Sequence, residues 1–296
     1  MKSKKTRHFI EYISLKTVIG FVRAVGFNMA VKVSACVAGF VYYFLPIRKK
    51  LMMESLSYAF PDKTLKERKA ILKNVYKHFA RTFVEIMFFP VMNSAELKEM
   101  MVYENIYLIE QALKKGNGAV VLSAHFGNWE LTALSFAKRY PLSVIVAEQS
   151  NKMVDSLIND VRSFKGFETI YKDNNPFKAV MKALKSNRVV AILADQDASH
   201  QGVFVPFFNR LASTAKGPAL FALRANCPIL CGFGVRQPNG KYIVKFEEIP
   251  HPNTGNQEKD VEIIMAAYMK KLEIAATLHP EHWFWFHRRW NTKPRA

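Results

Sequence analysis

Apolar and polar residues change their pattern along this chain of 296 residues, and residues 1–50 form the first distinct region. This region is an apolar stretch interrupted by Lys16, Arg23 and Lys32. Its longest uncharged run, 33–47, is shorter than the roughly 20 residues that a membrane-spanning helix needs. Basic side chains can extend to lipid headgroups, so a tilted span and a helix lying in the interface both remain open. A buried helical hairpin is the third interpretation.

The second region begins at Thr64 and has the period of an amphipathic helix. Thr64-Leu65-Lys66-Glu67 is a capping box, in which side chains at the two ends bond the backbone amides of the first turn. One face of the expected helix is apolar and the other is rich in Lys and Arg. The apolar positions are Leu72, Val75, Phe79, Phe83 and Ile86.

Beyond Asn105, helical and strand-like patterns alternate. A helix should end at Lys115, and strands are predicted over 118–124, 142–147, 167–171, 189–194, 229–235 and 242–246. Further helices are predicted over 128–139, 152–164, 177–186, 214–225 and 258–278. The alternation predicts an α/β fold with a mixed central sheet flanked by helices. We therefore expect an N-terminal membrane-associated helix or anchor over 1–50 and one α/β domain over 51–296.

Charge and composition narrow the classes of partner. The chain has 43 basic and 24 acidic residues, a formal charge of +19, which favours nucleic acid, an anionic bilayer or an acidic carrier protein. The 23 Phe and 12 Met favour lipid. No helix-turn-helix, zinc or RNA-platform pattern supports nucleic acid binding. The three cysteines form no metal-ligand pattern and are expected to be reduced.

The strand over 118–124 is followed by the sequence His125-Phe-Gly-Asn-Trp-Glu130, in which Gly127 permits a tight turn and Asn128 caps a helix. A histidine oriented by a carboxylate removes a hydroxyl proton near neutral pH, so these residue types suit acyl transfer to an alcohol. A buried, satisfied pair is the alternative. The chain has no Gly-x-Ser-x-Gly motif, which favours direct transfer without a covalent intermediate.

Three other segments carry candidate chemistry. Asp195 and Asp197 follow a predicted strand, where they would orient an acceptor or a basic side chain, or cap a turn. An aromatic run precedes Ser213 and Thr214 at an expected helix start, where free amides and Lys216 would bind an anion. Residues 280–290 combine aromatic residues typical of a membrane interface with two adjacent arginines suited to a lipid phosphate. Core packing is the alternative for the tryptophans, but it does not explain the adjacent arginines.

Several motifs occur in the same order in a known family. They are His125-x4-Glu130, Ala194-Asp195-Gln196-Asp197, Phe-Val-Pro-Phe-Phe followed by Ser-Thr-x-x-Gly, Cys227-Pro228-Ile229 and Trp-Phe-His-Arg-Arg-Trp. Residues 55–61, Ser-Leu-Ser-Tyr-Ala-Phe-Pro, add a further match. Together they resemble the bacterial lipid A secondary acyltransferases over nearly the whole chain.

The resemblance implies a glycerolipid-acyltransferase-like fold, a membrane anchor, acyl-acyl-carrier-protein as donor and a lipid-linked hydroxyl as acceptor at the cytoplasmic face of the inner membrane. It also implies that His125 is the base and Glu130 its partner. No metal or tightly bound cofactor is expected. The candidate substrate-binding residues are Asn128, Arg162, Asp195, Asp197, Ser213, Thr214, Lys216, Arg288 and Arg289.

The acceptor is the open part of this interpretation. Asn151 and Arg162 lie in a region similar to the family's second motif, but Glu148-Gln149-Ser150 stands where a basic residue is common. Relatives with the same motif acylate other glycolipids, including mannosylated phosphatidylinositol. A lipid esterase would use the same pair of residues to activate water. Lys178, Lys182 and Lys185 on one helical face either dock the acidic carrier or form an ordinary solvated face.

Overall fold

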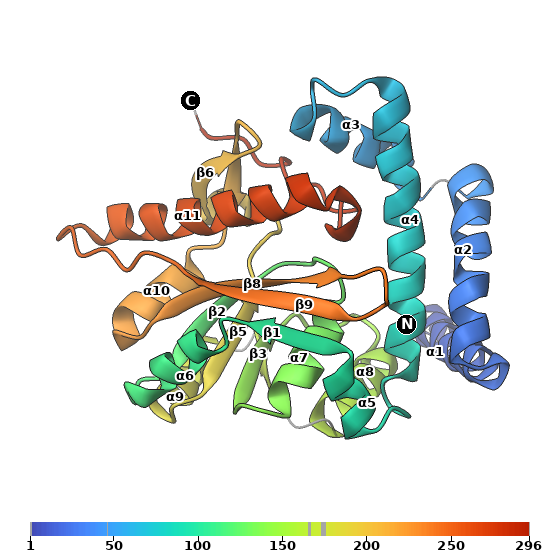
Figure 1. Cartoon of the computed structure of the whole chain (residues 1–296), viewed down its shortest axis with the longest axis horizontal. Coiled ribbons are helices and arrows are strands. Elements are labelled where there is room, and N and C mark those ends of the chain that lie inside the picture. Colours follow the sequence, from blue (N-terminus) through green and yellow to red (C-terminus); the bar gives the residue numbers. More distant parts are fainter. Residues whose placement is uncertain (1, 46, 165–166, 173–175, 296) are drawn as a thin grey trace.

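The computed structural model describes residues 2–45, 47–164, 167–172 and 176–295. Its centre is a seven-stranded sheet with the order β1-β9-β8-β2-β5-β3-β4 (Figure 1). Neighbouring strands are parallel except β8 and β9, which are antiparallel, so the predicted mixed sheet is confirmed. The strands are β1 (Met101–Glu104), β2 (Ala119–Ser123), β3 (Leu142–Val146), β4 (Glu168–Tyr171), β5 (Val189–Leu193), β8 (Ile229–Arg236) and β9 (Tyr242–Glu248).

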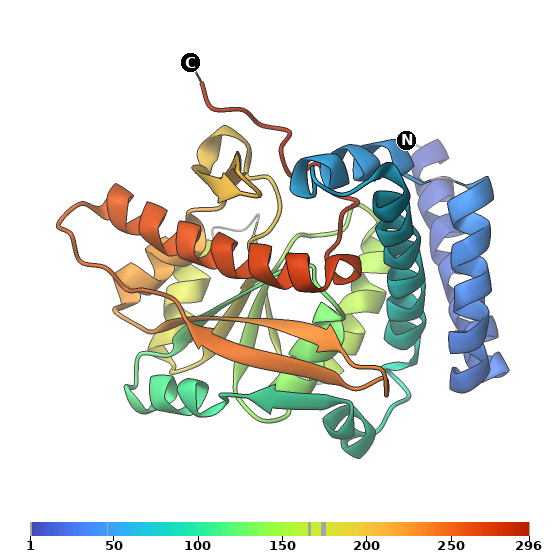
Figure 2. The ribbon, with the colours of Figure 1, turned by 45° about the horizontal axis from the view of Figure 1, so that its top comes forward.

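Helices cover both faces of this sheet and create two apolar cores (Figures 1 and 2). Val120 and Leu122 of β2 face one core, whereas Ala119 and Val121 face the other. This explains why the central strands are apolar at every position rather than at alternate ones. The covering helices are α5 (Ser94–Glu99), α6 (Tyr107–Lys114), α7 (Trp129–Ala137), α8 (Lys152–Phe164), α9 (Pro176–Lys185), α10 (Gly217–Ala225) and α11 (Gln257–Leu278).

The chain begins with the helices α1 (Lys2–Val25), α2 (Phe27–Phe44), α3 (Lys49–Ala59) and α4 (Leu65–Phe88). The capping box at the start of α4 is confirmed, because Thr64 and Glu67 bond each other's backbone amides. Leu72, Val75 and Phe79 are buried as predicted, while Phe83 is about half exposed. Within the described residues, α2 is the one helix that is long and apolar enough to cross a membrane.

A β-hairpin that we did not expect precedes the helix predicted over 214–225 and includes its first predicted residue, Thr214. Strands β6 (Val203–Phe207) and β7 (Arg210–Thr214) pair in an antiparallel manner, and α10 begins only at Gly217. The two turn residues, Phe208 and Asn209, have φ angles of 49° and 58°, as a tight two-residue turn requires. The expected helix start was wrong because this turn lacks the glycine that marks most such hairpins.

Candidate active site

The register between β2 and β5 creates the candidate site. These strands are parallel neighbours, with Ser123 paired to Leu193, and the amide of Ala194 donates to the Ser123 carbonyl over 3.2 Å. His125 and Asp195 therefore emerge side by side, each two residues beyond its strand. Carboxyl ends of neighbouring parallel strands are the usual position of sites in open α/β sheets.

Asp195 holds the His125 side chain through direct contacts. Its Oδ1 lies 2.9 Å from His125 Nδ1, and its Oδ2 accepts the His125 backbone amide over 3.1 Å. The indole nitrogen of Trp283 donates to the same Oδ2 over 3.0 Å. Asp195 is only 3% exposed, whereas the side chain of His125 is 22% exposed. The imidazole is thus fixed on its buried side and open on the other.

Electrostatics set the protonation of this pair. Burial favours the neutral form of Asp195, but the charge of His125 and the hydrogen bonds from His125 and Trp283 hold the pKa of the carboxyl below its ordinary value. Burial likewise lowers the pKa of His125, but Asp195, with a smaller contribution from Glu130, raises it above the ordinary value overall. An ionised Asp195 only accepts hydrogen bonds, so His125 Nδ1 carries the proton and Nε2 keeps the lone pair.

The turn after His125 needs a glycine. Gly127 has a φ of +61°, and a Cβ there would lie 1.9 Å from the Gly234 carbonyl oxygen. The turn is also bonded to residues 282–292, which we term the closing segment. The Gly127 amide donates to the His282 carbonyl over 2.8 Å, and the Phe284 amide donates to the His125 carbonyl over 2.9 Å. Residues distant in sequence therefore fix the turn from both sides.

A buried carboxylate on α4, that of Glu85, is hydrogen-bonded to the end of the His125 turn. Glu85 is fully buried and accepts hydrogen bonds from Asn128 Nδ2 (2.9 Å), Arg236 Nη2 (2.9 Å), the Tyr242 hydroxyl (2.7 Å) and Arg81 Nε (3.0 Å). Four donors compensate the cost of burying the charge. Because Asn128 begins α7, Glu85 links α4 to the turn that carries His125.

Replacing Glu85 with glutamine should destabilise the fold by about 3 to 5 kcal/mol, because Arg236 would lose its buried counter-charge and an amide donor would face other donors. Chemical denaturation would measure the loss. Glu67→Gln on the same helix is the matched control, since glutamine also completes a capping box and Glu67 is exposed. Equal stability of the two variants would contradict a supporting role for Glu85.

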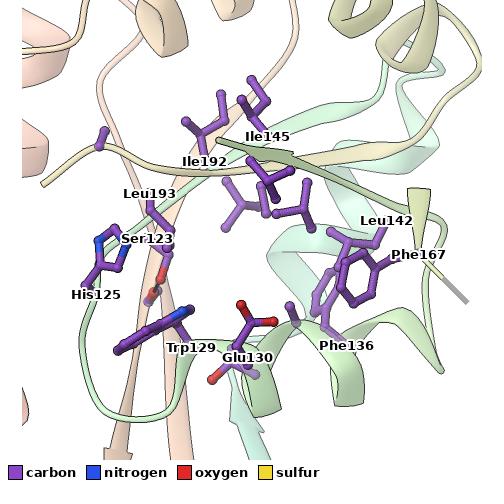
Figure 3. Close-up of a pocket in the computed structure, with 18 of the residues that line it drawn as sticks. Ser123, His125, Trp129, Glu130, Phe136, Leu142, Ile145, Phe167, Ile192 and Leu193 are labelled. Carbon is purple, nitrogen blue, oxygen red and sulfur yellow. Dashed lines mark hydrogen bonds between the residues drawn. The ribbon is translucent and has the colours of Figure 1, made fainter. Parts of the chain in front are cut away.

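A cavity of about 500 Å³ opens beside His125, between the sheet and α7. Figure 3 shows His125 at one end and Phe136, Leu142 and Phe167 at the other. Polar residues also line the cavity, including Glu130, Gln149, Gln196 and Asp197. The far end is apolar, so the cavity suits a ligand with a reactive polar end and a long hydrocarbon chain.

The comparisons with known proteins agree with this geometry. Residues 1–292 match the family model described as bacterial lipid A biosynthesis acyltransferase. The chain belongs to this family. It is 29% identical over 264 residues to the lipid A biosynthesis lauroyltransferase of Escherichia coli K12, covering 86% of this chain and 82% of the relative.

Two further relatives show the breadth of substrates among similar proteins. The E. coli lipid A biosynthesis palmitoleoyltransferase is 23% identical, covering 85% of this chain and 81% of its own. A phosphatidylinositol mannoside acyltransferase of Mycobacterium tuberculosis is 26% identical, covering 72% of this chain and 67% of its own. This lipid A acyltransferase family member is accordingly an O-acyltransferase, as predicted, and its relatives acylate glycolipids.

The acid that contacts the His125 ring nitrogen in this acyltransferase is Asp195, whereas the sequence argument gave that role to Glu130. Glu130 lies in the first turn of α7 and directs its carboxylate into the cavity (Figure 3). Asp195, predicted to bind substrate, is buried against His125 and Trp283 instead. Asp197 lines the cavity, and it also accepts hydrogen bonds from Ser199 and Thr292.

Four other predicted substrate-binding residues are buried in the acyltransferase and bonded to protein groups. Asn128 has no exposed surface; it caps α7 at the Leu131 amide and donates to Glu85. Ser213 and Thr214 lie fully buried on β7 rather than at a helix start. The guanidinium of Arg289 donates to the Ser213 carbonyl and the Thr214 hydroxyl.

Burial lowers the pKa of Arg289 to about 10, although Asp195, Tyr268 and Asp197 oppose that change. Arg289 is therefore a core residue, whereas Arg288 beside it is exposed. Lys216 is also exposed, at the start of α10. Arg162 lies on α8, but its side chain is outside the described part of the chain.

Sequence analysis missed two partners of the acyltransferase site. Trp283 and Trp285 suited both a membrane interface and a core; both are almost completely buried, and the Trp283 indole donates to Asp195. The Tyr268 hydroxyl on α11 donates to the Ser123 carbonyl over 2.6 Å. No local pattern marks either residue, because an aromatic ring with one polar atom suits a core and an interface equally well.

One group of side chains in the described part of the acyltransferase has the composition of a metal site, namely His279, Glu281 and His282. Both ring nitrogens of His282 already have protein partners. Its Nε2 accepts a hydrogen bond from the Arg236 amide over 3.1 Å, and its Nδ1 lies 3.1 Å from a Glu281 carboxylate oxygen. A third free ligand atom is therefore missing, and we assign no metal to this group.

Proposed function

We propose that this protein transfers a fatty acyl group from acyl-acyl-carrier-protein directly to a hydroxyl of a lipid A precursor, with His125 as general base. The observation that carries the proposal is the His125 imidazole, held by buried Asp195 and facing a cavity whose far end is apolar. A base, an oriented tautomer and a place for a hydrocarbon chain are what acyl transfer to an alcohol requires.

In this mechanism His125 Nε2 takes the proton of the acceptor hydroxyl while the hydroxyl oxygen forms a bond to the thioester carbonyl carbon. Asp195 stabilises the imidazolium that results. The carbon–sulfur bond then breaks, and the imidazolium returns the proton to the leaving thiolate. The products are the new ester and the carrier thiol, and His125 is neutral again.

Direct transfer is favoured by the position of the serine nearest the base. The Ser123 hydroxyl donates to the Gly232 carbonyl over 2.8 Å, and the residue belongs to β2 rather than to an exposed turn. A serine nucleophile is normally bonded to its base. Here the His125 nitrogen on the protein side is bonded to Asp195, which leaves Nε2 for the acceptor.

Electrostatics also support the proposed partners. The charge of +19 favours both an acidic carrier and an anionic membrane surface, such as the cytoplasmic face of the inner membrane. Three lysines are exposed on α9, namely Lys178, Lys182 and Lys185. They remain the predicted docking surface for the acidic carrier.

The decisive experiment supplies purified enzyme in mixed micelles with acyl-acyl-carrier-protein, with and without a lipid A precursor. Mass spectrometry should detect acylated precursor, and carrier thiol should appear only when the acceptor is present. Equal release of free fatty acid without acceptor would identify an esterase and contradict the proposal. Phosphatidylinositol mannosides form a second arm, because one of the relatives carries that name.

Phe167 at the far end of the cavity should limit acyl length. We expect Phe167→Leu to shift the preferred donor toward longer chains, with each additional buried methylene contributing about 0.8 kcal/mol, or roughly fourfold in kcat/KM. Competition between donors of different length would measure the shift. Phe89→Leu is the control, since Phe89 is buried in the same core but does not line the cavity. An unchanged preference in Phe167→Leu would exclude Phe167 as the limit.

A further inference from the structure

Helix α2 has two faces of different character. One face is buried and carries Ala30, Ser34, Ala38 and Tyr42, spaced four residues apart. The small residues on this face allow a neighbouring helix to approach closely. Beside this buried face, large apolar side chains are exposed along the whole helix, namely Met29, Val33, Val37, Phe40 and Phe44. Such a continuous exposed apolar face is typical of a surface that binds lipid or protein.

The helix that covers the buried face is α4, and the two run side by side over the full length of α2 (Figures 1 and 2). At one end the rings of Phe27 and Phe88 lie 5.3 Å apart. At the other end the rings of Tyr42 and Tyr76 lie 5.7 Å apart. The two helices are therefore antiparallel, and any depth that α2 reaches in a membrane is shared by the second half of α4.

That half of α4 is unsuited to the interior of a bilayer. Lys77 is exposed on it and Arg81 is partly exposed, and Lys73 and Asn74 lie just before it. The same half buries Glu85 under the catalytic turn. Charged side chains at the centre of a bilayer are strongly unfavourable, and a crossing α2 would carry these residues there. The packing of α2 on α4 is therefore incompatible with a transmembrane α2.

We propose that α2 lies in one leaflet of the membrane, parallel to its surface, with its Met29-to-Phe44 face among the lipid chains. Lys32 on the exposed part of α2 reaches the headgroups, and exposed Lys4, Lys5 and Lys16 of α1 add charge for anionic lipid. Both ends of α2 and the catalytic domain then lie on the same side of the bilayer. This inference rests on the proposed membrane attachment and not on the acyl-transfer chemistry.

Sidedness tests the proposal without measuring activity. Cys36 is exposed, whereas Cys227 and Cys231 are buried, so a Cys36→Ser chain offers a low labelling background. The Cys36→Ser protein would then carry one new cysteine at an exposed position, either Lys5→Cys in α1 or Lys115→Cys in the catalytic domain. A membrane-impermeant maleimide should label both variants in inside-out vesicles and neither in right-side-out vesicles. Labelling of the two positions from opposite sides would overturn the proposal.

Flotation with vesicles of phosphatidylethanolamine and phosphatidylglycerol tests the face itself. Phe40→Asp should lower the partition coefficient for the vesicles at least roughly tenfold, because it removes a phenylalanine from the lipid. Asn74→Asp on α4 adds the same charge beside α2 but outside the lipid, and should float like the unmodified protein. Loss of flotation in both variants would mean that α4 is immersed. A change of oligomeric mass in Phe40→Asp with normal flotation would assign the face to a second copy. Either result would overturn the proposal.

Discussion

Replacing His125 with alanine should lower kcat for acyl transfer by about 100- to 10,000-fold, the contribution typical of a positioned general base. The structure leaves one nitrogen of this ring for the acceptor, because Nδ1 is bonded to Asp195. A residual rate is expected, since the variant still binds both substrates and holds them together. Quantitative mass spectrometry of acylated acceptor, with both substrates saturating, would measure the loss.

The control for this variant is His200→Ala, which removes an exposed histidine five residues after Asp195. It should retain normal activity, and thermal unfolding of His125→Ala should show that the fold is intact. If a folded His125→Ala protein kept a tenth or more of the normal kcat, proton removal by His125 would not be the main contribution to catalysis. Membrane binding through α2 would be unaffected by that result.

Replacing Asp195 with asparagine should lower kcat by up to about 10,000-fold and also move the pH dependence. Asp195 raises the pKa of His125 above its ordinary value by stabilising the imidazolium. Since the base acts in its neutral form, activity of the unmodified enzyme should fall as the pH drops through that raised pKa. Without the carboxylate the pKa of His125 falls, so the acid limb of the kcat/KM profile should move to lower pH. A pH series of initial rates would measure both effects.

Two comparisons separate orientation of the base from general stability. Asp260→Asn removes another buried carboxylate, which accepts hydrogen bonds from Thr254 rather than from the site, and should leave the acid limb in place. Glu130→Gln tests the pairing suggested by the sequence. A larger shift of the acid limb in Glu130→Gln than in Asp195→Asn would restore Glu130 as the orienting acid and refute the role given to Asp195.

The sequence predicted those elements of the fold whose pattern of apolar and polar residues is visible within the element itself. The runs before His125 and Asp195 are apolar at every position because both faces of β2 and β5 are covered, and such runs identify central strands. The hairpin of β6 and β7 was missed because Phe208 and Asn209 adopt left-handed backbone angles without a glycine. Boundaries of this kind depend on the surrounding structure rather than on local propensity.

The site was predicted in part, and the missing part depends on strand order. His125 was identified from its own motif, and the nearest acid in sequence, Glu130, was the natural partner. Asp195 lies 70 residues away and becomes the contact only because β5 is the neighbour of β2 in this register. The burial of Arg289 was missed for a similar reason. An arginine suits a lipid phosphate or a buried carbonyl, and only the tertiary structure shows that it bonds Ser213.

The closing segment gives the maturation of this enzyme a fixed order. Ribosomes make a chain from its N-terminus at about 5 to 20 residues per second, so His125 and Asp195 exist for some time before Trp283 does. During that interval Asp195 lacks its indole donor, and the backbone of the His125 turn lacks its bonds to residues 282 and 284. We therefore expect the surroundings of His125 to be completed late in translation. A premature stop codon before position 282 would leave His125 and Asp195 in place but remove these hydrogen bonds, and we expect the resulting polypeptide to be inactive.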